Sequence, residues 1–205
     1  SKKPEVELSK NYVKIAKKYG VKPTLFCTGK TVVQNKKEME KLSNMKNVEI
    51  GGHTFNAFDK FSPEILYLFG KLWNCSYGPK TLQKRDIKKT VNVFKQKLNT
   101  KIKSWRTHAF SSNENTMKIL KKTQIEFVSD DIDRKSKKPK KENGLTYVPI
   151  NTIVDHDSLL HADIKERKGP VLTQNNPGGL TGKEWLKIIK DQIKEKEKQN
   201  DLSVL

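Results

Sequence analysis

The spacing of hydrophobic residues alternates along the chain between a helical period and short apolar runs. Apolar side chains recur every three or four positions, as on one face of a helix, over residues 8–19, 32–42, 63–72, 87–98, 113–122 and 181–193. Short apolar runs typical of buried strands lie between them, at residues 24–28, 48–50, 102–105, 125–129, 147–150 and 171–173. Strands that alternate with helices are typical of parallel sheets, so the pattern predicts an α/β fold.

The first and last helices carry clear boundary signals. Gly20 ends the first, whose apolar residues are Leu8, Tyr12, Ile15, Ala16 and Tyr19. The last begins with a capping box formed by Thr181 and Glu184. We expect it to bury the apolar stripe made of Trp185, Ile188, Ile189 and Ile193.

Polar residues with catalytic potential follow four of the predicted strands. They are His53; Arg106 and His108; Asp130, Asp131 and Asp133; and the run Gln174, Asn175 and Asn176. Because the carboxyl ends of parallel strands meet at one rim, we expect these groups to surround a single cavity. The alternative is four unrelated surface loops.

The composition indicates a globular protein with an unusually basic surface. The chain has 205 residues and a net charge of +19, and we predict one domain, residues 1–205. Only four of its 42 basic residues are arginine, although base and phosphate recognition favours arginine's bidentate fork. We therefore interpret the lysines as solvated helix faces and expect no specific nucleic-acid partner. The dense basic block within residues 134–144 is predicted to be a surface loop.

Targeting and redox signals are weak. No run approaches the roughly 20 apolar residues of a membrane span, and the first four residues precede no apolar signal segment. We therefore expect a cytoplasmic protein by default. Cys27 and Cys75 are isolated and lack metal-type spacing, which favours buried, inert thiols over a disulfide.

Four segments together resemble the polysaccharide deacetylases, the NodB-homology enzymes of carbohydrate esterase family 4. Residues 48–58, VEIGGHTFNAF, are similar to the family's second motif, His-(Ser/Thr)-x-x-His. Residues 19–29, YGVKPTLFCTG, are similar to the strand before that motif, and residues 104–110, SWRTHAF, to the third motif, Arg-x-Pro-(Tyr/Phe). Residues 127–131, FVSDD, match the next strand and its acidic end. The order and spacing of the four segments make the resemblance fairly specific.

The resemblance implies a fold, a reaction and a set of site residues. The fold is a distorted (β/α) barrel of about seven strands. The reaction removes an N-acetyl or O-acetyl group from a carbohydrate, with a divalent metal, zinc being the best candidate, that polarises the carbonyl and activates a water. We predict His53 as a metal ligand, with His108 as a substitute second ligand. The predicted catalytic residues are Arg106, Asp131 and His156, and the predicted substrate-binding residues are Thr54, Asn56, Phe110 and Asn176.

Three departures from the family pattern leave two interpretations open. The family's aspartate pair would fall near Ser1 and Lys2, Ala57 stands where a second histidine ligand is expected, and Asn176 replaces a proton-donating histidine. Either the chain lacks its first strand and uses substitute ligands, or it is a domain that has lost catalysis and binds carbohydrate. Substitutes are available in His108 and in the stretch 155–157, with His161 nearby.

The candidate residues also have structural interpretations. His53 alone would fill a turn, and Arg106 would form an ordinary salt bridge with Asp130 or Asp131. The pair Asp155 and His156 is also typical of a helix N-cap.

Overall fold

The computed structural model describes residues 5–155, 158, 179–199, 201, 203 and 204. They form two compact units. The first comprises residues 1–128 and 143–145, and the second residues 129–142 and 146–205.

Four parallel strands form the centre of the first unit, in the order β1, β2, β3, β4. They are β1 (Thr24–Cys27), β2 (Glu49–Gly52), β3 (Ser104–Trp105) and β4 (Phe127–Val128). The Glu49 carboxylate ties the first three strands together, since it accepts hydrogen bonds from Thr24, at 2.8 Å, and from Ser104. The predicted α/β fold with parallel strands is confirmed, and hydrogen bonds between the described strands do not close them into a ring.

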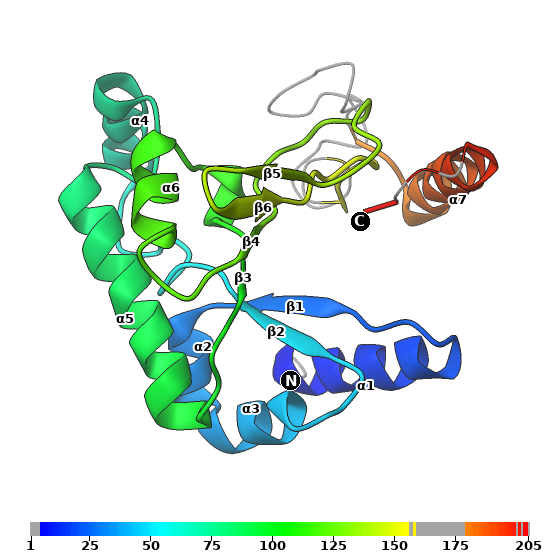
Figure 1. Cartoon of the computed structure of the whole chain (residues 1–205), viewed down its shortest axis with the longest axis horizontal. Helices are drawn as coiled ribbons and strands as arrows, with labels where there is room; N and C mark the ends of the chain where they lie inside the picture. The colour runs from blue at the N-terminus through cyan, green and yellow to red at the C-terminus, as the bar shows by residue number, and fades with distance from the viewer. Residues whose placement is uncertain (1–4, 156–157, 159–178, 200, 202, 205) are drawn as a thin grey trace. The chain divides into compact units, whose positions relative to one another are not determined.

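Helices surround these strands (Figure 1). They are α1 (Glu5–Lys18), α2 (Gly29–Gln34), α3 (Lys36–Ser43), α4 (Pro63–Trp73), α5 (Lys80–Leu98) and α6 (Glu114–Leu120), with a 3₁₀ turn at His108–Phe110. The long α5 packs against α2, α3 and α6. The predicted helix over residues 32–42 is in fact two helices, because Asn35 leaves the helical conformation at φ −124° and ψ 41°.

The first helix buries a different face from the one its larger apolar residues suggest. Its buried residues are Val6, Val13 and Ala16. The large side chains of Leu8, Tyr12, Ile15 and Tyr19 are each at least half exposed in the described chain. The sequence pattern predicted the helix, but smaller residues form its buried face, and the helix contacts α3.

Two glycines at the end of β2 permit close packing of the sheet against its neighbours. A Cβ atom on Gly52 would lie 2.6 Å from the fully buried Trp105 ring and 2.8 Å from Ile102. One on Gly51 would lie 2.7 Å from the Phe26 ring. The Gly-Gly pair before His53 is therefore required by space, not only by turn geometry.

The described residues of the second unit include two short strands and one long helix. Strand β5 (Lys140–Glu142) and β6 (Leu145–Tyr147), whose first residue belongs to the first unit, flank Asn143 and Gly144, both with positive φ. The exposed β5 lies inside the predicted loop 134–144, and β6 begins two residues before the predicted strand. The predicted strand at 171–173 lies outside the described residues.

The final helix, α7 (Gly182–Lys198), confirms the sequence interpretation in detail. Thr181 and Glu184 form the predicted capping box, with the Thr181 N–H donating to Glu184 at 2.8 Å. Ile189 is buried against Ile153 and Leu180. The predicted partners on the stripe, Trp185, Ile188 and Ile193, pack around this cluster.

We predict opposite effects of alanine at two glycines. Gly52→Ala should lower the free energy of unfolding by roughly 1–3 kcal/mol, because the new methyl group overpacks the Trp105 contact. Gly70→Ala, in the open middle of α4 with no atom within 4 Å of the new Cβ, should raise it. The expected gain is roughly 0.5–1 kcal/mol. Urea unfolding measures both, and a destabilised Gly70→Ala or an unchanged Gly52→Ala would contradict the packing.

Candidate active site

His53 is placed by hydrogen bonds that continue the sheet beyond its last assigned residues. Its N–H donates to the Cys27 carbonyl at 3.0 Å, and the Arg106 N–H donates to the Gly52 carbonyl at 3.0 Å. The ends of β1, β2 and β3 therefore lie level, and the residues that follow them come together at one edge, as parallel topology requires.

The two histidines of this edge contact each other directly. His53 Nδ1 lies 2.7 Å from the Arg106 carbonyl oxygen, and His53 Nε2 lies 3.2 Å from His108 Nδ1. Because a carbonyl oxygen only accepts, Nδ1 of His53 carries the proton and donates it. Nε2 of a neutral His53 is then the lone-pair nitrogen, and it faces His108.

Strained backbone is concentrated in the two loops that carry these histidines. After His53, positive φ angles occur at Thr54 (57°), Ala57 (53°) and Phe58 (65°), and after His108 at Ala109 (52°) and Phe110 (53°). Residues other than glycine adopt this conformation at a cost, and such strain gathers at functional sites. The surrounding contacts must therefore hold both loops in place.

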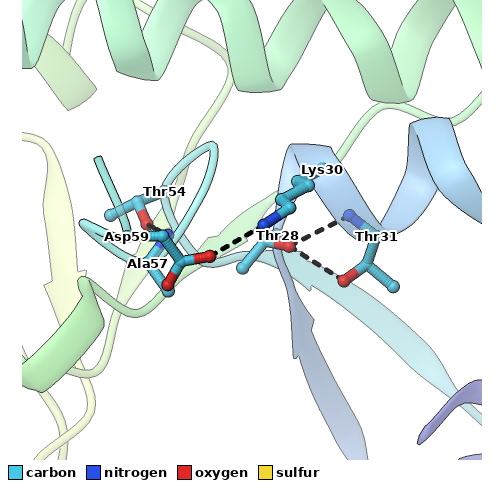
Figure 2. Close-up of polar contacts among 6 residues, drawn as sticks. All are labelled: Thr28, Lys30, Thr31, Thr54, Ala57 and Asp59. Carbon is cyan, nitrogen blue, oxygen red and sulfur yellow. Dashed lines mark hydrogen bonds and ion pairs between the residues drawn. The ribbon is translucent and has the colours of Figure 1, made fainter.

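Backbone and side-chain contacts attach the loop after His53 to the start of α2 (Figure 2). The backbone N–H of Gly29 donates to the Thr54 carbonyl at 3.1 Å, and that of Lys30 to the Phe55 carbonyl at 2.7 Å. The Lys30 ammonium also binds the Asp59 carboxylate at 2.8 Å. These contacts fix the loop at both of its ends.

The Thr54 hydroxyl stabilises the turn from inside. Thr54 is fully buried, and its Oγ1 accepts a hydrogen bond from the Ala57 N–H at 3.2 Å (Figure 2). The Thr54 side chain therefore has the structural role of holding this turn.

A partly buried carboxylate on α5, that of Asp86, supports the same loop. Asp86 accepts the Phe55 N–H at 3.0 and 3.2 Å and the Tyr77 hydroxyl at 2.6 Å. Burial raises the pKa of Asp86, and it outweighs the two hydrogen bonds and the Lys89 charge, which lower it. Asp86 stands out in the sequence because it is the single acid of a strongly basic helix.

Aromatic rings connect this support to the histidine pair. The buried Phe58 ring packs against Tyr77 at 5.2 Å between centroids, and edge-on against His108 at 5.3 Å. His108 is therefore held by Phe58 on one side and faces His53 on another. No sequence signal singled out Phe58 for this contact.

The Arg106 guanidinium lies among aromatic faces. It is 4.6 Å from the Phe26 ring centroid and 5.9 Å from that of Phe110. Cation–π contacts of this kind hold a guanidinium in one orientation while it keeps its charge. The predicted residues Arg106 and Phe110 are thus in contact.

A cavity of about 200 Å³ adjoins His53, between α1 and the ends of β1 and α2. Its lining includes the thiol of Cys27 and the carboxylate of Glu5, an acid that sequence reasoning did not consider. Burial, together with the charge of Glu5, raises the pKa of Cys27 to about 12. The uncoordinated Cys27 thiol is therefore protonated at neutral pH and is a poor nucleophile.

The predicted site residues fall into three groups. The first unit brings together His53, Arg106, His108 and Phe110, with Thr54 and the half-buried Asn56 on the loop after His53. Asp131 is exposed in the second unit, where its carbonyl accepts the Ile150 N–H at 2.7 Å. His156 and Asn176 lie outside the described residues.

The histidine pair meets part of a metal's requirement. Two nitrogens bound to one tetrahedral zinc ion lie about 3.3 Å apart, because Zn–N bonds are about 2.0 Å long. The observed 3.2 Å between His53 Nε2 and His108 Nδ1 suits two such ligands. Within the described residues, no group of three His, Cys, Asp or Glu side chains is placed to hold an ion. The donor set is thus incomplete, and no catalytic step is assigned to a metal.

The sequence profile of the polysaccharide deacetylases matches residues 3–128. This segment covers more than half of the chain and contains His53, Arg106 and His108. The chain therefore belongs to the polysaccharide deacetylase family, and the resemblance inferred from its motifs is confirmed. No curated protein sequence is close enough to the chain to count as a match.

Solved structures of the same family share the fold. A protein from Mycobacterium smegmatis assigned as a polysaccharide deacetylase is 14% identical, with a TM-score of 0.68 over 94% of this chain and 60% of that one. A mutant of BA3943, a pseudoenzyme of carbohydrate esterase family 4 from Bacillus anthracis with restored enzymatic activity, is 18% identical, with a TM-score of 0.51 over 95% of this chain and 59% of that one. The predicted fold class is confirmed.

The chain is shorter than these relatives, since it covers 60% and 59% of their lengths. Among the residues that the structure describes, no helix is both long and apolar enough to cross a membrane.

We predict that Asp86→Asn changes how stability depends on pH. The pKa of Asp86 is raised above its ordinary 3.8 in the folded chain, so the folded chain holds this proton to higher pH than the unfolded chain. Its contribution therefore favours folding most at low pH and is lost as the pH rises through the raised pKa. Because Asn does not titrate, the difference in unfolding free energy should move in favour of the variant as the pH rises from the ordinary carboxyl pKa through the raised pKa of Asp86. A difference that stays constant with pH would contradict the raised pKa.

Proposed function

We propose that this chain is a hydrolase domain that removes N-linked or O-linked acetyl groups from a carbohydrate, with a divalent metal, zinc being the first candidate. Family membership supports the reaction class. The observation that carries the proposal is the pair of imidazoles, 3.2 Å apart, at the carboxyl ends of β2 and β3.

The two histidines and Arg106 suit roles in metal binding and in orienting charge at the site. A bound metal would supply a polarised acyl carbonyl and an activated water. His53 and His108 would provide two of its ligands, and the hydrogen bond from His53 Nδ1 to the Arg106 carbonyl fixes which nitrogen of His53 is available. The Arg106 guanidinium, held by Phe26 and Phe110, offers a fixed positive charge to a carboxylate or a developing oxyanion.

The remaining roles need a base, an acid and contacts with the sugar. Asp131 is proposed as the base in place of the family's aspartate pair, and Glu5 is a second candidate because it lines the cavity beside His53. His156 is proposed to protonate the leaving group. Asn56, Phe110 and Asn176 are proposed to contact the sugar, together with the backbone at Thr54.

A second candidate function is carbohydrate binding without catalysis. Ala57 in place of the family's histidine, and the lack of a third ligand within the described residues, favour this alternative. Metal content and acetate release distinguish the two functions.

We predict that the purified chain binds one zinc ion per molecule. His53→Ala and His108→Ala should each lower the zinc affinity at least roughly tenfold, since each removes one nitrogen ligand. Tyr67→Ala, which removes an exposed ring from α4, serves as the control and should bind as the wild type does. Equilibrium dialysis with elemental analysis measures the affinity. A protein that stays metal-free and releases no acetate from chitooligosaccharides would refute the hydrolase and leave the binding function.

We also predict that one of two carboxylates acts as the base. If it is Glu5, Glu5→Gln should lower kcat for acetate release by roughly 100-fold or more, the usual scale of general acid–base catalysis, while Asp131→Asn changes it little. The reverse result would assign the base to Asp131. Comparable activity in both variants would exclude both residues as the base, and zinc binding should persist in either case as a sign of an intact fold.

A further inference from the structure

Six lysines line one groove between α5 and α6 in the first unit. The groove encloses about 630 Å³. Its lysines are Lys80, Lys84, Lys88, Lys118, Lys121 and Lys122. In the sequence these lysines are spread over two helices and look like solvated helix faces. In the fold they line the same groove.

The lysines of α5 form a regular ladder along one wall. Lys80, Lys84 and Lys88 are spaced four residues apart, so they lie on one helix face with a rise of about 6 Å between them. Lys118, on α6, and Lys121 and Lys122, directly after it, form the opposite wall. A linear partner that lies along the groove would meet positive charge on both sides.

The positive charge of the groove is largely uncompensated. Lys118 pairs with Glu114 at 2.7 Å, while the other five lysines form no ion pair within the part of the chain that the structure describes. None of the described residues that line the groove is acidic. Lysines four residues apart on a helix repel each other, so an anionic partner would relieve a cost that the free protein carries.

Buried hydrogen bonds hold the two walls at a fixed distance. Thr116 of α6 donates its hydroxyl proton to Gln83 Oε1 of α5 at 2.7 Å, and both side chains are fully buried. Gln83 Nε2 in turn donates to the Gly78 carbonyl at 2.8 Å. The groove is therefore a preformed feature of the packed helices.

The residues other than lysine that line the groove indicate which class of anionic partner it can bind. Within the part of the chain that the structure describes, Ile119 and Thr123 complete the lining, which offers no aromatic ring on which a base would stack and no arginine fork for a base edge. We propose that this groove binds an anionic polysaccharide, one that carries a carboxylate, sulfate or phosphate group on successive sugars. This binding does not depend on the proposed catalytic site, because no residue of the groove belongs to that site.

A charge-matched pair of triple variants tests the proposal. The groove variant is Lys84→Gln, Lys88→Gln and Lys121→Gln, and the control is Lys14→Gln, Lys17→Gln and Lys97→Gln, exposed lysines outside the groove lining. Both lose three charges, and glutamine keeps a similar helix propensity. The probe is fluorescent polygalacturonate, measured by anisotropy at several salt concentrations around 0.15 M, with heparin and oligo(dT) of similar charge as comparisons.

We expect the groove variant to bind polygalacturonate at least roughly tenfold more weakly. Its affinity should also depend less steeply on salt concentration, because fewer lysine contacts release fewer counterions on binding. The control should stay within roughly twofold of the wild type, since its lysines touch no ligand. Equal losses in both triple variants would overturn the proposal in favour of net charge alone. The proposal would also be overturned if oligo(dT) bound as tightly as the glycans, or if no glycan bound near physiological salt. Acetate release from neutral chitooligosaccharides should be unchanged in the groove variant, which separates failure of this proposal from failure of the hydrolase.

Discussion

The hydrogen bond between His53 Nδ1 and the Arg106 carbonyl is the interaction on which the candidate site depends. It joins the residues that follow β2 and β3, and at 2.7 Å it requires the two strands to end at the same level. Gly52 makes this possible, because only a residue without a side chain fits against Trp105 at that point. The position of one imidazole is thus determined by the packing of the sheet.

The site also relies on contacts from a helix that contributes no residue to the histidine pair. Asp86 of α5 binds the backbone after His53 and the Tyr77 hydroxyl. Tyr77 packs on Phe58, and Phe58 packs on His108. A carboxylate whose charge is disfavoured by burial therefore stabilises both loops, and its hydrogen bonds compensate for the strain of their positive φ angles.

Much of this arrangement could be predicted from local sequence. The alternation of helix and strand predicted the parallel sheet, and parallel topology explains why His53, Arg106 and His108 meet although more than 50 residues separate the first from the others. Capping also acts locally, so the start of α7 was predicted correctly from Thr181 and Glu184. These features depend on spacing alone, which a sequence displays directly.

Features that depend on tertiary packing were not predictable in the same way. The burial of Val13 in place of Tyr12 on α1 reflects how closely the helix approaches its neighbours. The break at Asn35, the role of Asp86 and the convergence of lysines between α5 and α6 each arise from contacts between distant segments. A periodic pattern contains no information about which helix will lie beside which.

The thiol of Cys27 has a consequence for the chemical character of the site. Soft metals such as copper(I) are captured by thiolates, and oxidants attack the thiolate far faster than the thiol. With its pKa at about 12, Cys27 remains protonated beside His53. The position next to the histidine pair is therefore occupied by a protonated thiol that oxidants attack slowly, and not by a soft thiolate donor.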